Sequence, residues 1–219
     1  MNNLYNDIWE LFQDKSDILF GISNIDFSEY KSEYKCALVF AVPHTELLSI
    51  NSYKEENLEN LILEARDRIN TLLEEITTIL KKHKIQYYIP PVAQSNEETL
   101  IAPFSFKFAC VNAGLGWIGK NGVLITKKYG PRVRLSAILI NSDLSKGSPI
   151  AKSKCPTDCN ICINACPYKA LTGYQWNIDT KREELIDYKL CNQKRSLYIK
   201  THQRKHSCGL CIVSCPIGI

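Results

Sequence analysis

Two cysteine-rich stretches stand out in the sequence: Cys155-x3-Cys159-x2-Cys162-x3-Cys166-Pro167 and, farther along, Cys208-x2-Cys211-x3-Cys215-Pro216. Iron in an iron–sulfur cluster takes soft thiolate ligands, and short spacings let one loop surround a cluster. The proline after the last cysteine of each group fixes φ and removes a donor, so the turn does not continue as a helix. Two such groups, each ending in Cys-Pro, are typical of proteins that hold two 4Fe–4S clusters.

The spacing also predicts which thiols share a cluster. In two-cluster proteins, the cysteine before proline reaches across to the other cluster. The second group lacks a leading cysteine, and Cys191 is the nearby candidate to replace it. We name the predicted ligands of one cluster the first thiol set: Cys155, Cys159, Cys162 and Cys215. The second thiol set is Cys166, Cys191, Cys208 and Cys211.

Zinc and disulfides are the alternatives for these cysteines. Zinc ribbons also use paired CxxC units, but they do not require Cys-x3-Cys-Pro twice. Disulfides need an oxidising compartment, and the N-terminal residues lack the basic and apolar regions of a signal peptide. We therefore expect a cytoplasmic protein. No apolar run reaches the length of a bilayer, and no membrane partner is predicted.

Composition adds little about partners. The 219 residues carry a net charge of +4, from 27 Lys and Arg against 23 Asp and Glu. Basic residues gather in two places, which are Lys127, Lys128, Arg132 and Arg134, and then Lys194, Arg195, Lys200, His202, Arg204, Lys205 and His206. We interpret both groups as solvated surface in preference to a nucleic-acid site. Cys36, which opens an apolar run, is interpreted as a small buried hydrophobe.

Strands and helices alternate ahead of the cysteines. Hydrophobic periodicity predicts helices over 4–13, 58–80 and 104–113. Apolar runs bounded by Gly or Pro predict strands over 18–25, 36–42, 85–89, 122–126 and 133–141, with a loop over 94–102 and a linker over 141–154. The fold class is therefore α+β, with an α/β core over 1–146 and a small Cys-rich module over 147–219.

The glycine-rich stretch Ala113-Gly-Leu-Gly-Trp-Ile-Gly-Lys-Asn-Gly122 nearly matches two nucleotide-binding motifs. Its GxGxxG pattern follows a predicted helix where a dinucleotide site requires a strand, and Asp143 lies too far on. As a P-loop it lacks the magnesium-binding Ser or Thr, because Asn121 stands there. We interpret the stretch as a tight turn beside which Lys120 can meet an anionic group.

In combination these motifs resemble a known group. Four motifs are similar to those of the epoxyqueuosine reductase and reductive dehalogenase superfamily: the segment from Ala113 to Lys120, the segment Tyr129-Gly-Pro-Arg-Val-Arg-Leu135, and both cysteine groups. The resemblance covers about residues 35–217, and the motifs occur in the same order. The resemblance implies a nitroreductase-like, cobalamin-binding core followed by a ferredoxin-like module with two 4Fe–4S clusters. A lone cysteine before the second group belongs to the family pattern, as Cys191 does here. The implied cofactor-binding residues are Lys107, Gly114, Gly116, Trp117, Gly119 and Lys120.

The sequence departs from the family at three points. The first cysteine spacing is x3 where epoxyqueuosine reductases have x2. Their acidic general acid falls near Leu100 when aligned on Pro103, with Glu97 and Glu98 out of register. The chain ends three residues after Pro216, so we expect the C-terminal repeat region that helps hold tRNA to be lacking. Proton donors considered are Tyr87, Tyr88, Glu97 and Glu98, and no catalytic residue is assigned.

The resemblance implies a corrinoid-dependent reductase. Electrons from a low-potential donor such as ferredoxin or flavodoxin would pass through two clusters to a cobalamin that reduces an electrophilic small-molecule substrate. The alternative is an electron-transfer or corrinoid-reducing partner protein without substrate chemistry of its own. A third hypothesis, action on tRNA, rests on the family and the basic groups.

Overall fold

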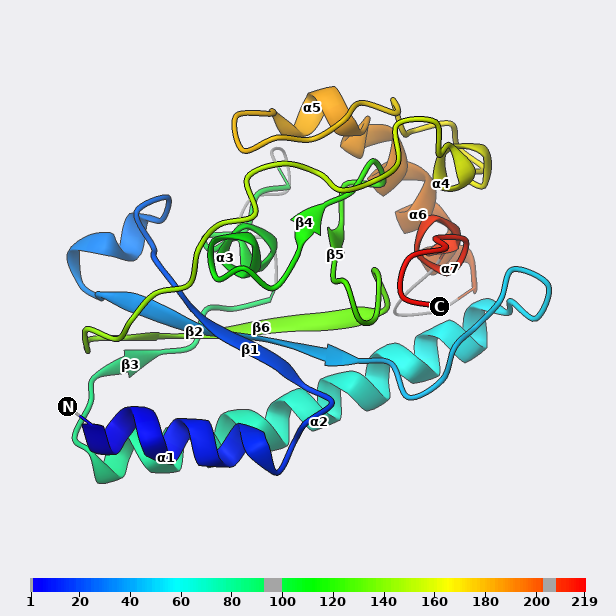
Figure 1. The fold of residues 1–219 in the computed structure, drawn as a ribbon. Helices are drawn as coiled ribbons and strands as arrows, with labels where there is room; N and C mark the ends of the chain where they lie inside the picture. Colours follow the sequence, from blue (N-terminus) through cyan, green and yellow to red (C-terminus); the bar gives the residue numbers. More distant parts are fainter. Residues whose placement is uncertain (1, 93–99, 203–207) are drawn as a thin grey trace. The chain divides into compact units, whose positions relative to one another are not determined.

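The computed structural model describes residues 2–92, 100–202 and 208–219 (Figure 1). They form two compact units built from alternating stretches of chain. Unit 1 comprises Met1–Pro43, Arg66–Leu115 and Arg134–Pro149, and unit 2 comprises His44–Ala65, Gly116–Val133 and Ile150–Ile219. The predicted division into 1–146 and 147–219 remains a prediction, because these units describe packing rather than the limits of folding domains.

Unit 1 is a four-stranded sheet with helices packed on it. Its strands are β1 (Leu19–Ser23), β2 (Cys36–Pro43), β6 (Val133–Ile140, from Arg134 on) and β3 (Tyr87–Tyr88), in the order β1-β2-β6-β3. Its helices are α1 (Asn2–Gln13), the 3₁₀ turn η1 (Glu29–Ser32), residues 66–82 of α2 (Glu55–Lys82) and α3 (Phe106–Asn112). Mixed helix and sheet is the predicted class.

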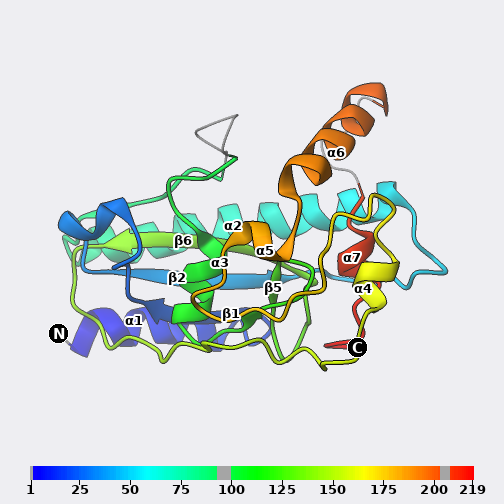
Figure 2. The same cartoon turned by 90° about the horizontal axis from the view of Figure 1, so that it is seen from above.

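The sheet of unit 1 is covered on both faces. Every residue of β2 is buried, as its continuous apolar run predicts for an inner strand. On β1, Phe20 stacks on Phe12 of α1 with ring centroids 4.0 Å apart. The next residue, Gly21, faces Ala113 at the end of α3, where a Cβ would come within 3.1 Å of the Ala113 Cβ. Because successive strand residues point to opposite faces, α1 and α3 lie on opposite sides of the sheet (Figure 2).

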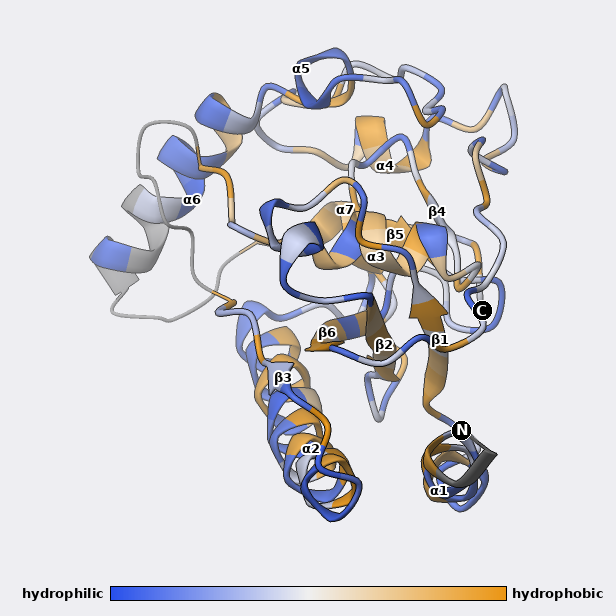
Figure 3. Ribbon diagram, turned by 90° about the vertical axis from the view of Figure 1, so that its left-hand side faces the viewer, coloured by the Kyte–Doolittle hydropathy of each residue, from blue (hydrophilic) through white to orange (hydrophobic). Residues whose placement is uncertain are grey.

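Helix α2 confirms the longest predicted helix. Its residues in unit 1 bury Ile69, Leu72, Ile76 and Leu80, which recur at spacings of three and four. Hydrophobic residues line β1 and β2, while α1 and α2 carry both hydrophobic and hydrophilic residues (Figure 3). The last turn of α2 is basic, and the helix is followed by His83, whose Nε2 lies 2.9 Å from Asp7 Oδ2 of α1.

The predicted strands at 18–25, 36–42 and 133–141 are confirmed with small shifts at their ends. The expected strand over 85–89 shortens to Tyr87–Tyr88, which pairs with β6. Part of the loop predicted over 94–102 lies outside the described residues. None of the described helices combines the length and apolar composition that a membrane-spanning segment requires.

Unit 2 contains the cysteines of both thiol sets. Its elements are the hairpin β4 (Trp117–Ile118) and β5 (Leu124–Ile125), and the helices α4 (Ile161–Asn164), α5 (Arg182–Leu185), α6 (Tyr188–His202) and α7 (Leu210–Val213), together with residues 55–65 of α2. Helix α4 packs against α7. A small apolar core joins the start of α2 to α7 through Leu48, Leu58, Leu61, Ile62 and Val213.

Candidate metal centre

All ten cysteines lie among the described residues, and all are free thiols. The disulfide alternative is therefore not realised. Cys36 and Cys110 are completely buried in unit 1, as predicted for Cys36, whose Sγ lies 3.1 Å from the Ser142 carbonyl oxygen. Burial alone raises the pKa of the Cys110 thiol far above its usual value. These two cysteines are structural, and the other eight belong to unit 2.

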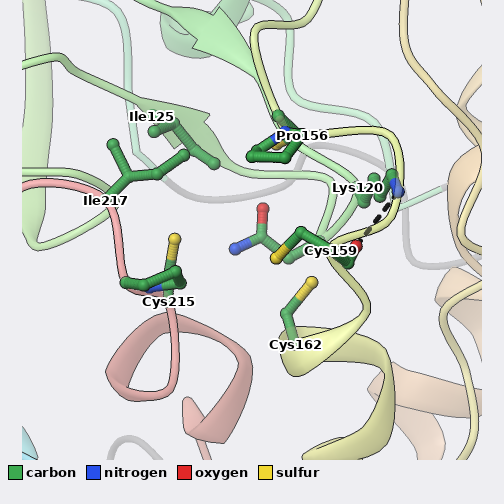
Figure 4. A pocket seen from close by; sticks show the side chains of 10 residues that line it. Lys120, Ile125, Pro156, Cys159, Cys162, Cys215 and Ile217 are labelled. Carbon is green, nitrogen blue, oxygen red and sulfur yellow. Dashed lines mark hydrogen bonds between the residues drawn. The ribbon is translucent and has the colours of Figure 1, made fainter.

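The side chains of the first thiol set come together in one pocket. Cys155, Cys159, Cys162 and Cys215 all line it, although Cys215 is distant in sequence. The Sγ atoms of Cys159, Cys162 and Cys215 point into the same space (Figure 4). Burial and, to a smaller extent, the charges on Cys215, Cys155 and Cys159 raise the pKa of the Cys162 thiol to about 11. The reach of Cys215 to the other group is the crossing that the sequence predicts.

The members of the second thiol set also lie close to one another. Burial raises the pKa of the Cys191 thiol, and Cys208 and Cys166 contribute to the increase. Burial raises the pKa of Cys211 more strongly, with further contributions from Cys208, Cys191, Cys162 and Cys166. Because Cys162 belongs to the first set, the two sets are near each other within unit 2.

Three side chains from residues 120–132 connect the two cysteine segments. Lys120 Nζ donates hydrogen bonds to the carbonyl oxygens of Thr157 at 2.7 Å and Cys159 at 3.0 Å. Asn121 Nδ2 donates to the Cys211 carbonyl oxygen at 3.0 Å, in the segment that carries the other group. Since each bond fixes a backbone group next to a thiol, these two adjacent residues help set the positions of both cysteine loops.

Arg132 acts on the last cysteine. Its Nη1 donates to the Cys215 carbonyl oxygen at 2.9 Å, and its Nη2 donates to the Ile217 carbonyl oxygen. Only 5% of Arg132 is exposed, and this burial lowers the pKa of its guanidinium. The interpretation of its basic group as solvated surface is therefore wrong for Arg132, because the backbone carbonyls of the cysteine segment bury and solvate it. Lys127 and Lys128 are exposed, as expected.

The second thiol set has a different set of backbone contacts. Cys208 N–H donates to Glu55 Oε1 at 2.8 Å, and Tyr53 Oη donates to the Cys208 carbonyl oxygen at 2.8 Å. Cys208 has a φ of 62°, in the left-handed region that non-glycine residues rarely adopt. Glu55 and Tyr53 thus hold a strained backbone position from both sides. Cys191 lies in the first turns of α6, where Asp187 Oδ1 accepts from Leu190 N–H.

Within the described residues, no group of three or more Cys, His, Asp or Glu side chains is placed to hold a metal ion. A single zinc ion requires its thiolates at about 2.3 Å from one centre. A four-iron cluster instead binds one thiolate at each iron corner, so its ligands stand farther apart.

The glycine-rich segment forms a tight structural turn, as the sequence analysis favours. A Cβ on Gly116 would lie 2.3 Å from the Ile125 carbonyl oxygen, and one on Gly119 would lie 2.3 Å from Ile125 Cδ1. Both glycines therefore permit the close pairing of β4 with β5. Trp117 is buried in β4, where its Nε1 has no hydrogen-bond partner among the described residues, and the Lys154 amine lies 6.0 Å from the centroid of its ring.

The other two residues predicted to bind cofactor lie in unit 1. Lys107 is an exposed residue of α3, and Gly114 follows the end of that helix with a φ of 77°. Helix α3 directly precedes the glycines, which confirms the reason for rejecting a dinucleotide site. Leu100, at the position of the family's acid, also has a positive φ, and Glu97 and Glu98 lie outside the described residues.

Comparison with known proteins gives relatives of two kinds. An epoxyqueuosine reductase from Lactococcus garvieae (strain Lg2) is 32% identical over 109 residues, covering 48% of this chain and 29% of that protein. A tetrachloroethene reductive dehalogenase from Dehalobacter restrictus (strain DSM 9455 / PER-K23) is 30% identical over 130 residues, covering 58% and 21%. The chain is a homologue of both. It spans 21% to 37% of the length of these two and six further curated relatives, and no protein-family model matches it.

Solved structures show the same fold over almost the whole chain. An epoxyqueuosine reductase from Streptococcus thermophilus matches with a TM-score of 0.60 at 17% identity, covering 100% of this chain and 66% of that one. Another epoxyqueuosine reductase, solved with an epoxyqueuosine-modified tRNA stem loop, gives 0.58 at 17% identity, with 99% and 66% covered. A reductive dehalogenase whose structure suggests a mechanism for B12-dependent dehalogenation gives 0.61 at 16%, with 90% and 29% covered. The resemblance inferred from the motifs is confirmed.

Sequence reasoning missed the residues that hold the second thiol set. Tyr53 and Glu55 precede Cys208 by 155 and 153 positions and belong to no motif, so only the fold could pair them with it. Asn121 was noted solely as a departure from a P-loop, yet it binds Cys211. Arg132 could have been found, because it stands in the Tyr129–Leu135 segment that carries the family resemblance.

Proposed function

We propose that this chain is an iron–sulfur oxidoreductase whose eight thiols hold two 4Fe–4S clusters, one in each thiol set. The observation that carries the proposal is that Cys215 lies with Cys155, Cys159 and Cys162 around one pocket. Bound clusters would supply one-electron transfer. In this account the second compact unit corresponds to a ferredoxin-like module and the sheet of unit 1 to a nitroreductase-like core.

The chain's own residues prepare this site in three ways. The cysteines supply soft donors for iron. Lys120, Asn121 and Arg132 satisfy carbonyl groups of the cysteine loops, which positions the thiols before iron arrives. Cys211 and Cys162 are both partly buried, which would limit the contact of a reduced cluster with solvent.

A corrinoid as electron acceptor belongs to the proposal through the relatives, one of which is described in terms of B12-dependent dehalogenation. The described residues predicted to face it have other contacts: Lys120 binds two carbonyl oxygens, and Ile125 fills the space beside Gly116 and Gly119. These contacts favour the second candidate function, an electron-transfer or corrinoid-reducing protein. We derive no chemical step through the corrin.

Anaerobic reconstitution tests both candidates. The chain is loaded with iron and sulfide, analysed for both elements, and then titrated with cob(II)alamin while the visible spectrum is recorded. About eight irons per chain and a shift of the corrin spectrum to the base-off form support the reductase. The same iron content without a corrin shift supports the electron carrier. Zinc as the only tightly bound metal contradicts both.

The predicted low-potential donor, small-molecule substrate and tRNA remain proposals. The tRNA stem loop bound by one epoxyqueuosine reductase supports a nucleic-acid partner, and Lys127 and Lys128 are exposed cations. Residues 203–207 of the second basic group lie outside the described residues. Salt-dependent binding of a tRNA stem loop would support this partner, and no binding at low salt would count against it.

A further inference from the structure

Lys120 is a buried cation held by neutral groups. Only 3% of it is exposed, and its ammonium contacts the carbonyl oxygens of Thr157 and Cys159. Across the described residues no Asp or Glu carboxylate forms an ion pair with it. Moving an ammonium group out of water is expensive unless an opposite charge compensates it, and carbonyl dipoles alone give partial compensation.

Arg132 repeats this arrangement beside Cys215. It is 5% exposed, its guanidinium binds the carbonyl oxygens of Cys215 and Ile217, and no described carboxylate pairs with it. Lys120 and Cys215 both line the pocket of the first thiol set. Two buried positive charges therefore stand beside four thiols that become thiolates when they bind iron.

On the basis of the proposed function, we propose that Lys120, assisted by Arg132, is the internal counter-cation of a cluster held by the first thiol set, and that it raises the reduction potential of that cluster. It is a positioning residue, because it acts through charge and through the Thr157 and Cys159 carbonyls without ligating iron.

The direction of the effect follows from the charge balance. Reduction adds one electron from an external low-potential reductant to the cluster and its thiolates; no protein bond forms or breaks, and no proton is required. The added negative charge is stabilised by a nearby buried cation, which solvent screens poorly. A neutral side chain at 120 should therefore lower the ratio of reduced to oxidised cluster about tenfold at a fixed potential, which corresponds to about 59 mV for a one-electron couple.

The second thiol set has charged neighbours of both signs. Glu55 binds Cys208 N–H, and the charges of Arg195 and Arg182 act on the Cys191 thiol and lower its pKa against the effect of burial. Both arginines are partly exposed, so water screens them more than it screens the buried Lys120. The counter-cation role is therefore proposed for the first set.

The test measures potentials rather than turnover. Wild-type protein and the variants Lys120→Met, Lys120→Gln, Lys120→Arg and Lys152→Gln are reconstituted anaerobically, assayed for iron and sulfide, and titrated by spectroelectrochemistry with electron paramagnetic resonance detection. Lys152 is the matched control because it is exposed and only three residues from Cys155, so it loses the same charge where water screens it.

We expect one of two one-electron potentials to fall in the Met and Gln variants and both to stay near wild type in the Arg and Lys152 variants. If both neutral variants lose one cluster while Lys120→Arg retains it, the positive charge is needed to hold the anionic cluster, which also supports the proposal. Unchanged potentials in a cluster-replete neutral variant would overturn it. Loss of the cluster in all three Lys120 variants would also overturn it, because the role would then be steric.

Failure of this inference is distinguishable from failure of the proposed function. If wild-type protein takes up no cluster iron, the proposed function is wrong whatever Lys120 does. If wild-type protein holds two clusters whose reduction potentials do not depend on the charge at position 120, the iron–sulfur function is supported and the counter-cation role of Lys120 is wrong.

Discussion

The two thiol sets contain the same four donors but differ in what surrounds them. Around the first set, the buried cations Lys120 and Arg132 donate to backbone carbonyl oxygens of its cysteine segments, whereas Asn121 donates to the Cys211 carbonyl oxygen of the second set. Around the second set, Glu55 accepts from Cys208 N–H and Tyr53 donates to its carbonyl. On the proposed function, equal ligands in unequal electrostatic surroundings would give two clusters with different potentials, since net charge and hydrogen bonding set the potential. The neighbours of a cysteine motif therefore carry information that the motif lacks.

The largest expected effect is the loss of iron from one thiol set while the other set keeps its iron. Cys162→Ala removes a ligand of the first set alone, so we expect iron to fall to about half, from about eight to about four per chain. Cys36→Ala is the matched control: this thiol is also buried but lies in unit 1, so its loss should cost about 1 kcal/mol of stability and no iron. Iron analysis and thermal unfolding measure the two outcomes. A full loss of iron in Cys162→Ala would show that the sets do not bind clusters independently.

The pH dependence of cluster uptake tests whether both sets begin as protonated thiols. Burial together with the neighbouring thiols raises the pKa of Cys162 to about 11, and burial also raises the pKa of Cys191. These groups hold protons in the metal-free chain near neutral pH and must release them to iron. Below its pKa, each thiolate fraction grows about tenfold per pH unit. The rate of iron uptake should therefore rise from pH 7 to pH 9, and a pH-stat should record the release of protons during uptake. Iron uptake that does not depend on pH would contradict the prediction that the thiols begin protonated.

A smaller effect concerns the charge beside the second set. Glu55→Gln keeps an oxygen acceptor for Cys208 N–H and removes the negative charge. We expect the reduced-to-oxidised ratio of one cluster to rise about threefold at a fixed potential, opposite in sign to the Lys120 variants. The exposed Glu56, one residue on, provides the control variant Glu56→Gln. If both glutamates behave alike, Glu55 does not distinguish the two sets.

The smallest expected effect tests the hold on Cys208. Tyr53→Phe keeps the ring that packs against the apolar core of unit 2 and removes the donor to the Cys208 carbonyl. Loss of one such hydrogen bond costs about 1 kcal/mol. We expect a chelator to remove iron from the second set several-fold faster while the first set releases iron at the wild-type rate. Equal acceleration in both sets would show that Tyr53 acts on unit 2 as a whole.

How far the sequence predicts this molecule depends on the range over which its interactions act. The helix around Ile69 and Leu72 and the buried strand from Cys36 were predictable, because periodicity and apolar runs are local properties. The grouping of Cys215 with Cys162 followed from the crossing rule. The stretches 44–65 and 116–133 could not be placed with the cysteines, because their pairing depends on contacts between residues far apart in the sequence.

The burial of Arg132 shows the same limit for charged residues. In a linear sequence it belongs to a run of cations, and such runs are ordinarily hydrated. Only the tertiary structure supplies the carbonyl oxygens of Cys215 and Ile217 that replace water around its guanidinium. Strand β5 lies within the strand predicted over 122–126, but its partner β4 was not predicted, because a two-residue strand carries no periodicity.

The crossing of Cys215 and Cys166 also bears on biosynthesis. A ribosome makes Cys155, Cys159 and Cys162 well before residues 208–215. Until that later segment emerges, each set is missing at least one donor and the nascent polypeptide exposes incomplete coordination shells. Both ligand sets would be completed at nearly the same time, after translation of the same short segment. The cellular machinery that delivers iron and sulfide would therefore assemble the two proposed clusters late in synthesis and together.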